Sequence, residues 1–136
     1  MDTGKQFVLT LGRWAARSAA DLEALARRAI LATAERTLAN TPVDTGFLRG
    51  NWQPTIGAPT PFKVFEPGDA VEPPKATSLV VATLKAGDTF YFTNNTAYAR
   101  FVEYGTSKMD GRFYMTRAVQ RWQQTVAEQA AAIGFR

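Results

Sequence analysis

A helical repeat of apolar residues fills the first third of the chain. From Leu11 onward, apolar and small side chains recur at a spacing of about 3.6 residues, with charged residues between them. The members of this stripe are Ala15, Ser18, Leu22, Leu25, Ala26, Ala29 and Thr33. The pattern predicts an amphipathic helix that begins near Thr10, although Ser18 and Asp21 could open a second helix after a break. The helix is expected to end before Pro42, because a proline disfavours the helical conformation in the residue before it.

The same helix carries a second apolar strip on its opposite face, in its C-terminal half. The strip is made of small and aliphatic residues, which are Ala20, Ala24, Leu31, Ala34 and Leu38. A surface helix needs only one apolar face, so a second one indicates either packing on both sides within the fold or contact with a neighbouring subunit. Leu31 and Leu38 are therefore candidate interface residues.

The middle of the chain alternates between strand-like runs and turns. A tight turn at Pro42, Asp44, Thr45 and Gly46 leads into a predicted strand over 47–53, in which Trp52 belongs to the buried face. A second pair of strands is predicted over 78–84 and 89–93, joined as a hairpin by the turn at 85–88.

A proline-rich loop over about 54–77 separates these strands. Six of the 7 prolines lie between Pro54 and Pro74, together with three acidic residues. A short strand is predicted inside it at 62–65. Loops of this length in a compact domain are usually functional or disordered, so we expect this one to contact a neighbouring molecule and to become ordered on assembly.

The last third of the chain returns to a helical period. Thr96 predicts the start of a short helix that ends at Gly105, and a C-terminal helix follows Gly111. The apolar stripe of that last helix consists of Met115, Val119, Trp122, Val126, Ala130 and Ile133. At 136 residues, the order of elements predicts one α+β domain over 1–136, with a long N-terminal helix packed on a small, mostly antiparallel β-sheet, a short helix and a C-terminal helix.

Composition narrows the chemistry that the chain can perform. It contains neither cysteine nor histidine, which removes disulfides, thiolate zinc sites and the commonest general base, so we expect no metal and no cofactor. The net charge of +4 comes from scattered residues and is typical of a solvated surface. The apolar runs are shorter than the ~20 residues of a membrane span, and no leader pattern opens the chain, so we expect synthesis in a cytoplasm-like compartment.

Two short motifs in predicted turns could indicate an enzyme. Asp44-Thr45-Gly46 matches the turn of aspartic proteases, which would require a homodimer here, but the flanking residues favour a plain helix-to-strand turn. Ser107 beside Lys108 could form a Ser/Lys dyad, but a glycine-flanked loop favours a polar turn or a contact site. We therefore expect a protein that is not an enzyme.

Two blocks of sequence carry a resemblance to a known family. The first is PVDTGFLRGNW at 42–52, behind the long helix, and the second is TNNTAYARFVEYGTSK at 93–108, before the terminal helix. In this order the blocks resemble those of the neck (head–tail joining) proteins of long-tailed bacteriophages. The resemblance extends from Arg13 to about Val119, and it implies a structural protein of the virion.

This resemblance implies a homo-oligomeric ring, expected to be a hexamer, between the head-side connector or head-completion protein and the tail terminator or tail tube. DNA would pass through the ring without sequence recognition. Tail terminator and tail completion proteins have a similar architecture and are alternatives, as is a non-specific nucleic-acid-binding module. Besides the helix positions, the candidate interface residues are Arg49, Tyr98, Glu103, Tyr104, Gly105, Ser107 and Lys108. Arg49 and Glu103 could form an internal ion pair.

Overall fold

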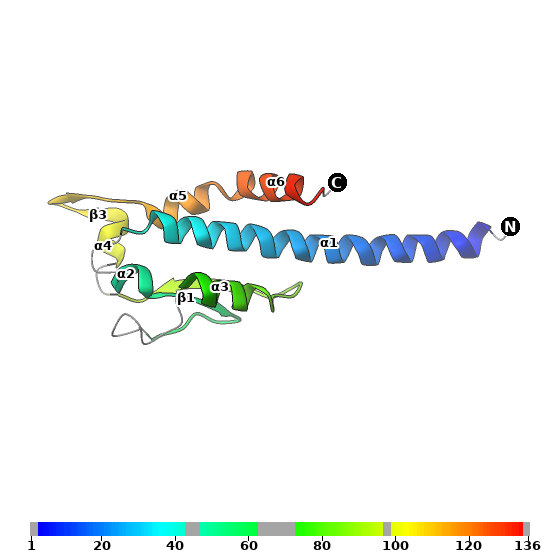
Figure 1. The fold of residues 1–136 in the computed structure, drawn as a ribbon, viewed down its shortest axis with the longest axis horizontal. Coiled ribbons are helices and arrows are strands. Elements are labelled where there is room, and N and C mark those ends of the chain that lie inside the picture. The colour runs from blue at the N-terminus through cyan, green and yellow to red at the C-terminus, as the bar shows by residue number, and fades with distance from the viewer. Residues whose placement is uncertain (1–2, 43–46, 63–72, 97–98, 135–136) are drawn as a thin grey trace.

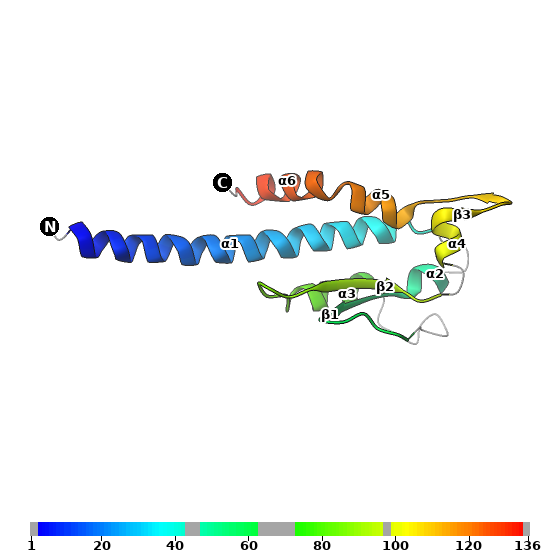
Figure 2. The same ribbon diagram turned by 180° about the vertical axis from the view of Figure 1, so that it is seen from behind.

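The computed structural model of this chain describes residues 3–42, 47–62, 73–96 and 99–134, and the side chains of the first helix from residue 19 onward. The fold is α+β, as predicted, and has three layers (Figures 1 and 2). Helix α1 (Thr3–Asn40) lies in the middle. Helices α5 (Tyr114–Gln120) and α6 (Trp122–Ala132) cover one side of it, and helix α3 (Pro73–Val81) with a two-stranded sheet covers the other.

The remaining elements are short. Helix α2 (Phe47–Gly50) precedes strand β1 (Trp52–Ile56), which pairs in antiparallel fashion with β2 (Phe90–Asn94). Helix α4 (Ala99–Tyr104) runs into a second antiparallel pair, β3 (Gly105–Thr106) and β4 (Met109–Asp110). Among the described residues, no helix is both long enough and apolar enough to cross a bilayer.

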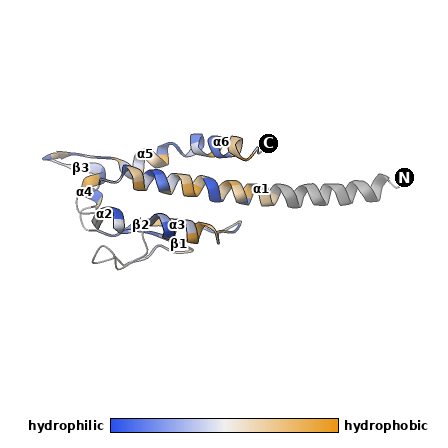
Figure 3. Ribbon diagram, in the orientation of Figure 1, coloured by the Kyte–Doolittle hydropathy of each residue, from blue (hydrophilic) through white to orange (hydrophobic). Residues whose placement is uncertain are grey.

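The position of α1 explains its two apolar strips. Ala29 and Leu25 of the main stripe are buried, and so are Ala34 and Leu38 of the second strip. Hydrophobic and hydrophilic residues alternate along the described part of this helix (Figure 3). The helix is therefore packed on both sides within its own chain over its C-terminal half, which is the first of the two alternatives that the sequence left open.

The end of α1 agrees with the sequence, whereas its start does not. The helix ends at Asn40, two residues before Pro42, and its last turn is closed by the amide of Thr41, which donates to the carbonyl oxygen of Thr37 at 3.0 Å. It begins at Thr3, well before the predicted cap at Thr10. No proline interrupts residues 3–10, and Gly4 falls in the first turn, where its low helix propensity has little effect.

Two predicted strands are helical in the structure. Residues 47–50 form α2, so the strand begins only at Trp52, although Trp52 is buried as expected. Residues 78–81 belong to α3, in which Pro73, Thr77 and Val81 are buried at a spacing of four residues. The β-branched composition suggested a strand, but proline at the start of a helix is favoured, and the four-residue spacing gives one helical face that can be buried where α3 contacts β1 and α1.

The proline-rich segment is correspondingly shorter than predicted. Its first residues belong to β1, where Pro54 lies opposite Phe92 in a sheet of two edge strands, a position that tolerates a missing amide. Its last residues belong to α3. Residues 63–72, and with them most of the short strand predicted at 62–65, lie outside the described residues.

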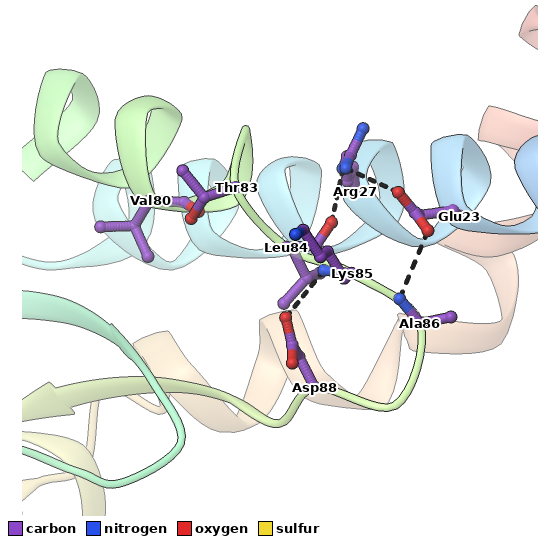
Figure 4. A network of polar contacts seen from close by, with 8 residues as sticks. All are labelled: Glu23, Arg27, Val80, Thr83, Leu84, Lys85, Ala86 and Asp88. Carbon is purple, nitrogen blue, oxygen red and sulfur yellow. Dashed lines mark hydrogen bonds and ion pairs between the residues drawn. The ribbon is translucent and has the colours of Figure 1, made fainter.

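A polar network fastens the connection between α3 and β2 to α1 (Figure 4). The guanidinium of Arg27 donates to the carbonyl oxygen of Leu84 at 2.8 Å and pairs with Glu23 at 2.7 Å. Within the connection, the amide of Lys85 donates to the Asp88 carboxylate at 2.8 Å. The predicted turn over 85–88 is thus confirmed, but it joins a helix to a strand, not two strands of a hairpin.

Candidate functional site

The two sequence blocks meet in the structure. Trp52, at the end of the first block, lies opposite Asn94 of the second block in the register of β1 and β2. The side-chain amide of Asn94 donates to the carbonyl oxygen of Leu48 at 2.7 Å, and its oxygen accepts from the hydroxyl of Thr96 at 2.8 Å. The blocks that carry the resemblance therefore hold the two halves of the chain together.

Trp52 is at the centre of the hydrophobic core. Its indole stacks on Phe92 with ring centroids 4.8 Å apart and meets the edge of Tyr114 at 6.0 Å. Its N–H donates to the hydroxyl of Thr41 at 3.0 Å, which joins the first block to the end of α1. Leu38 belongs to the same core with only 2% of its surface exposed, so its prediction as an interface residue is wrong. Leu31, by contrast, is half-buried.

Glu103 is buried and has a structural function. Its carboxylate accepts hydrogen bonds from the backbone amides of Met115 at 3.0 Å and Thr116 at 2.8 Å, and from the Thr116 hydroxyl at 2.6 Å. These donors belong to the first turn of α5, where backbone amides lack helical partners and a negative charge is stabilised. Arg49 is exposed on α2, so the predicted Arg49–Glu103 ion pair is wrong, and Glu103 is not free for an interface.

The β3–β4 hairpin projects from the end of the molecule near α4 (Figure 1). At its base the backbone amide of Phe113 donates to the carbonyl oxygen of Glu103 at 3.0 Å. Two glycines allow the chains to come this close. A Cβ atom on Gly105 would lie 2.6 Å from the amide nitrogen of Gly111, and one on Gly111 would lie 2.7 Å from the backbone carbonyl oxygen of Glu103. Gly105 also ends α4 with a φ of +85°, as predicted.

Large hydrophobic side chains are exposed around this hairpin. Tyr104 is 58% exposed and Phe101 53%, and Met109 and Phe113 are also exposed. We call these four residues the hairpin surface. Three cationic residues in the same segment are exposed as well, namely Arg100, Lys108 and Arg112. Aromatic side chains flanked by arginines are the composition of protein interfaces, and monomeric proteins seldom expose several together.

A second apolar surface lies on the C-terminal helices. Val119 is 57% exposed and Trp122 is 40% exposed, and we call this pair the helix surface. The residues that α5 and α6 bury are instead Tyr114, Ala118 and Thr125. The predicted apolar stripe is correct only in part: Met115 packs against the core and Val126, Ala130 and Ile133 are half-buried, whereas Val119 and Trp122 are exposed. A short break at Arg121 separates α5 from α6.

The other predicted residues lie either at the tip of the hairpin or outside the described residues. Ser107 and Lys108 lie in the exposed tip of the hairpin, where the Lys108 amide donates to the Thr106 hydroxyl at 3.2 Å. Asp44, Thr45, Gly46 and Tyr98 lie outside the described residues, which also leaves the aspartic-protease turn without a description. Met109, Phe113, Val119 and Trp122 were not predicted as surface residues. The available signal was Met109, an apolar residue between the charged residues Lys108 and Asp110.

On the described part of the chain, no three acidic side chains come together in a manner that could hold a metal ion. Comparison of the chain with protein-family models, with curated proteins and with solved structures finds no match. The candidate functional site is therefore defined by geometry, and it consists of the hairpin surface and the helix surface.

Proposed function

We propose that this chain is a structural virion protein that forms a ring at the head–tail junction of a long-tailed bacteriophage, where it joins the connector to the tail and leaves a channel for DNA. Support comes first from the resemblance of the two sequence blocks to neck proteins. The blocks pack against each other through Trp52 and Asn94, as expected of residues that maintain a common fold. The residues of the two blocks would then determine the fold of the subunit, and assembly of the ring would depend on the exposed apolar surfaces.

The observation that carries the proposal is that one chain presents two different exposed apolar surfaces. The hairpin surface is built from α4, β4 and the residue before α5, and the helix surface is built from α5 and α6. A ring requires a heterologous interface, in which one patch of each subunit meets a different patch of the next. Two unlike surfaces satisfy this requirement, whereas a symmetric dimer needs only one.

We expect the hairpin surface of one subunit to pack against the helix surface of its neighbour. Full burial of a large apolar side chain is worth about 1.5–3 kcal/mol, so Tyr104, Phe101 and Trp122 would dominate the affinity. The exposed cations Arg100, Lys108 and Arg112 would surround this contact and set its orientation. Because Glu103 and the two hairpin glycines fix the base of the hairpin, little conformational entropy is lost on assembly.

The test is electron microscopy of lysates from a phage that lacks only the gene for this chain. DNA-filled heads separate from finished tails would support the neck assignment. Tails of abnormal length would instead assign the chain to the tail terminator class, which has a similar architecture. Intact particles of normal appearance would overturn the proposal. Light scattering and negative-stain images of the purified chain provide a second readout, for which closed rings are expected.

A further inference from the structure

A basic recess lies between the end of α1 and helix α5. Its volume is about 370 Å³, and its walls are formed by Arg36 and Asn40 of α1 and by Arg117, Gln120 and Arg121 at the end of α5. Every one of these five side chains can donate hydrogen bonds, and three are always cationic. No carboxylate belongs to the lining. None of these residues belongs to the hairpin surface or the helix surface, although Gln120 and Arg121 adjoin Val119 and Trp122 in the chain.

The charges in the recess are poorly neutralised by the chain itself. Arg36 donates one hydrogen bond to the Thr125 hydroxyl at 3.0 Å, which leaves most of its donors available. Arg121 pairs with Glu128 at 3.6 Å, and both side chains are nearly half exposed, so this pair is weak. None of the described residues pairs with the guanidinium of Arg117. Of the three arginines, only Arg121 thus has an acidic partner among the described residues, and that pair is weak.

These arginines are not needed to complete the end of α1. A helix C-terminus presents unpaired carbonyl oxygens that cations often satisfy. Here the carbonyl oxygens of Thr37 and Leu38 already accept hydrogen bonds from the amide of Thr41, at 3.0 and 3.2 Å. The Thr41 hydroxyl donates to the Thr37 oxygen as well, at 2.6 Å. The arginines of the recess are therefore not required as partners for these two carbonyl oxygens.

We propose that this recess binds phosphate groups of a nucleic-acid backbone. Guanidinium groups and side-chain amides match the oxygens of a phosphate, and arginine binds them with two parallel hydrogen bonds. Arg117 and Arg121 are four residues apart, which places their side chains roughly 6 Å from each other along the helix. Each strand of a duplex carries one charge per ~3.4 Å of axis, so neighbouring phosphates can occupy both arginines at once.

A nucleic acid fits these features better than an acidic protein segment does. The recess has polar donors but no aromatic anchor of the kind that protein interfaces use. Arginine, asparagine and glutamine can also pair with base edges, but these donors line a recess between two helices and not an element that could enter a groove, so we expect contacts to the phosphates and binding that is independent of sequence. The inference rests on the proposed function for one point only, namely that the phosphates belong to double-stranded DNA.

The test measures the affinity of the purified full chain for a short fluorescent DNA duplex of mixed sequence by anisotropy, at several salt concentrations. We expect R117Q/R121Q to weaken binding at least tenfold at low salt and to reduce the slope of log affinity against log salt by about 2. The matched control is K75Q/K85Q, which removes the same charge at exposed positions outside the recess and outside the hairpin and helix surfaces. Circular dichroism melting shows that each variant is folded.

Three results would overturn the inference. Equal weakening in K75Q/K85Q would mean diffuse attraction by net charge. Poly-glutamate that binds the chain while the duplex does not would assign the recess to an acidic protein. Inorganic phosphate that saturates the recess while the duplex gains no advantage would make it a site for the free ion. The ring proposal is tested separately, because it fails if a phage without this gene produces normal particles. That outcome does not change the anisotropy measured with the purified chain.

Discussion

Glu103 and Thr116 are joined by two hydrogen bonds, one from the Thr116 amide at 2.8 Å and one from its hydroxyl at 2.6 Å. Through them the buried carboxylate at the end of α4 caps the first turn of α5. The residue before α5, Phe113, provides no side-chain cap and has a φ of +51°, a conformation that is uncommon outside glycine. The cap thus comes from another helix, and it fixes both ends of the hairpin that lies between them.

Replacing Glu103 with alanine should destabilise the fold strongly. The half-buried amides of Met115 and Thr116 would lose their acceptor, and each unsatisfied group costs about 1–3 kcal/mol, so we expect a loss of roughly 3 kcal/mol in the free energy of unfolding. Glu103→Gln keeps one acceptor and should lose about half as much. Urea denaturation measures both. The exposed Asp110→Asn serves as control, and an E103A variant as stable as this control would contradict the capping role.

Gly105→Ala should distort the hairpin. The new Cβ would lie 2.6 Å from the backbone nitrogen of Gly111 and 2.7 Å from the Met109 oxygen, and the φ of +85° would be strained as well. Positive φ costs an alanine about 1–2 kcal/mol, and the backbone clash adds to this, so we expect a total of about 2–4 kcal/mol.

The chain offers a matched control for that clash. Gly57 has a φ of +93°, but a Cβ there would meet nothing within 4 Å. Gly57→Ala should therefore lose only the roughly 1–2 kcal/mol of backbone strain. Equal thermal stabilities of the two variants would show that the close approach of Gly105 to Gly111 does not constrain the hairpin.

The long helices and the fold class could be predicted from the sequence because their signals are local. Pro42 ends α1 by its own stereochemistry, and Gly105 ends α4 in the same way. The segment 78–84 could not be assigned correctly, because its β-branched residues suit a strand until packing against α1 selects the helical spacing of Thr77 and Val81. The intrinsic strand propensity of these residues contributes less to the free energy of folding than the burial of such a helical face.

The candidate site was harder to predict than the fold. Apolar residues at helical spacing are expected to face the core, and this reasoning placed Val119 and Trp122 inside. They are exposed because the smaller residues Ala118 and Thr125 let α5 and α6 approach α1 closely on the other face. Glu103 is the opposite case, because it was expected at the surface and is buried. An acidic residue is normally exposed, and only the distant amides of α5 explain its burial.

The hydrogen bond between Trp52 and Thr41 should be measurable as a coupling energy. The Trp52 indole N–H donates to the Thr41 hydroxyl at 3.0 Å, and both residues are buried. We expect Thr41→Val and Trp52→Phe each to destabilise the protein, and the double variant to lose about 0.5–1.5 kcal/mol less than the sum. Chemical denaturation of the four proteins gives this number. Strict additivity would mean that the contact contributes nothing beyond packing.

Assembly through two unlike surfaces makes a prediction that a symmetric contact does not. A variant of the hairpin surface, Y104S/M109S, and a variant of the helix surface, V119S/W122S, should each be folded but unable to form rings, because each lacks one half of every contact. An equimolar mixture should then form heterodimers and nothing larger, since each pair retains one intact contact.

Native mass spectrometry of that mixture distinguishes the possibilities. Heterodimers are expected when the helix surface of the Y104S/M109S chain binds the hairpin surface of the V119S/W122S chain. Homodimers of either variant alone would instead show that one surface binds itself across a two-fold axis, and the ring would then need a different contact. Leu79→Ser is the control, because Leu79 is also exposed, at 60%, but lies on α3 outside both surfaces. It should leave ring formation unchanged, so that loss of rings in this variant would contradict the assignment of assembly to the hairpin and helix surfaces.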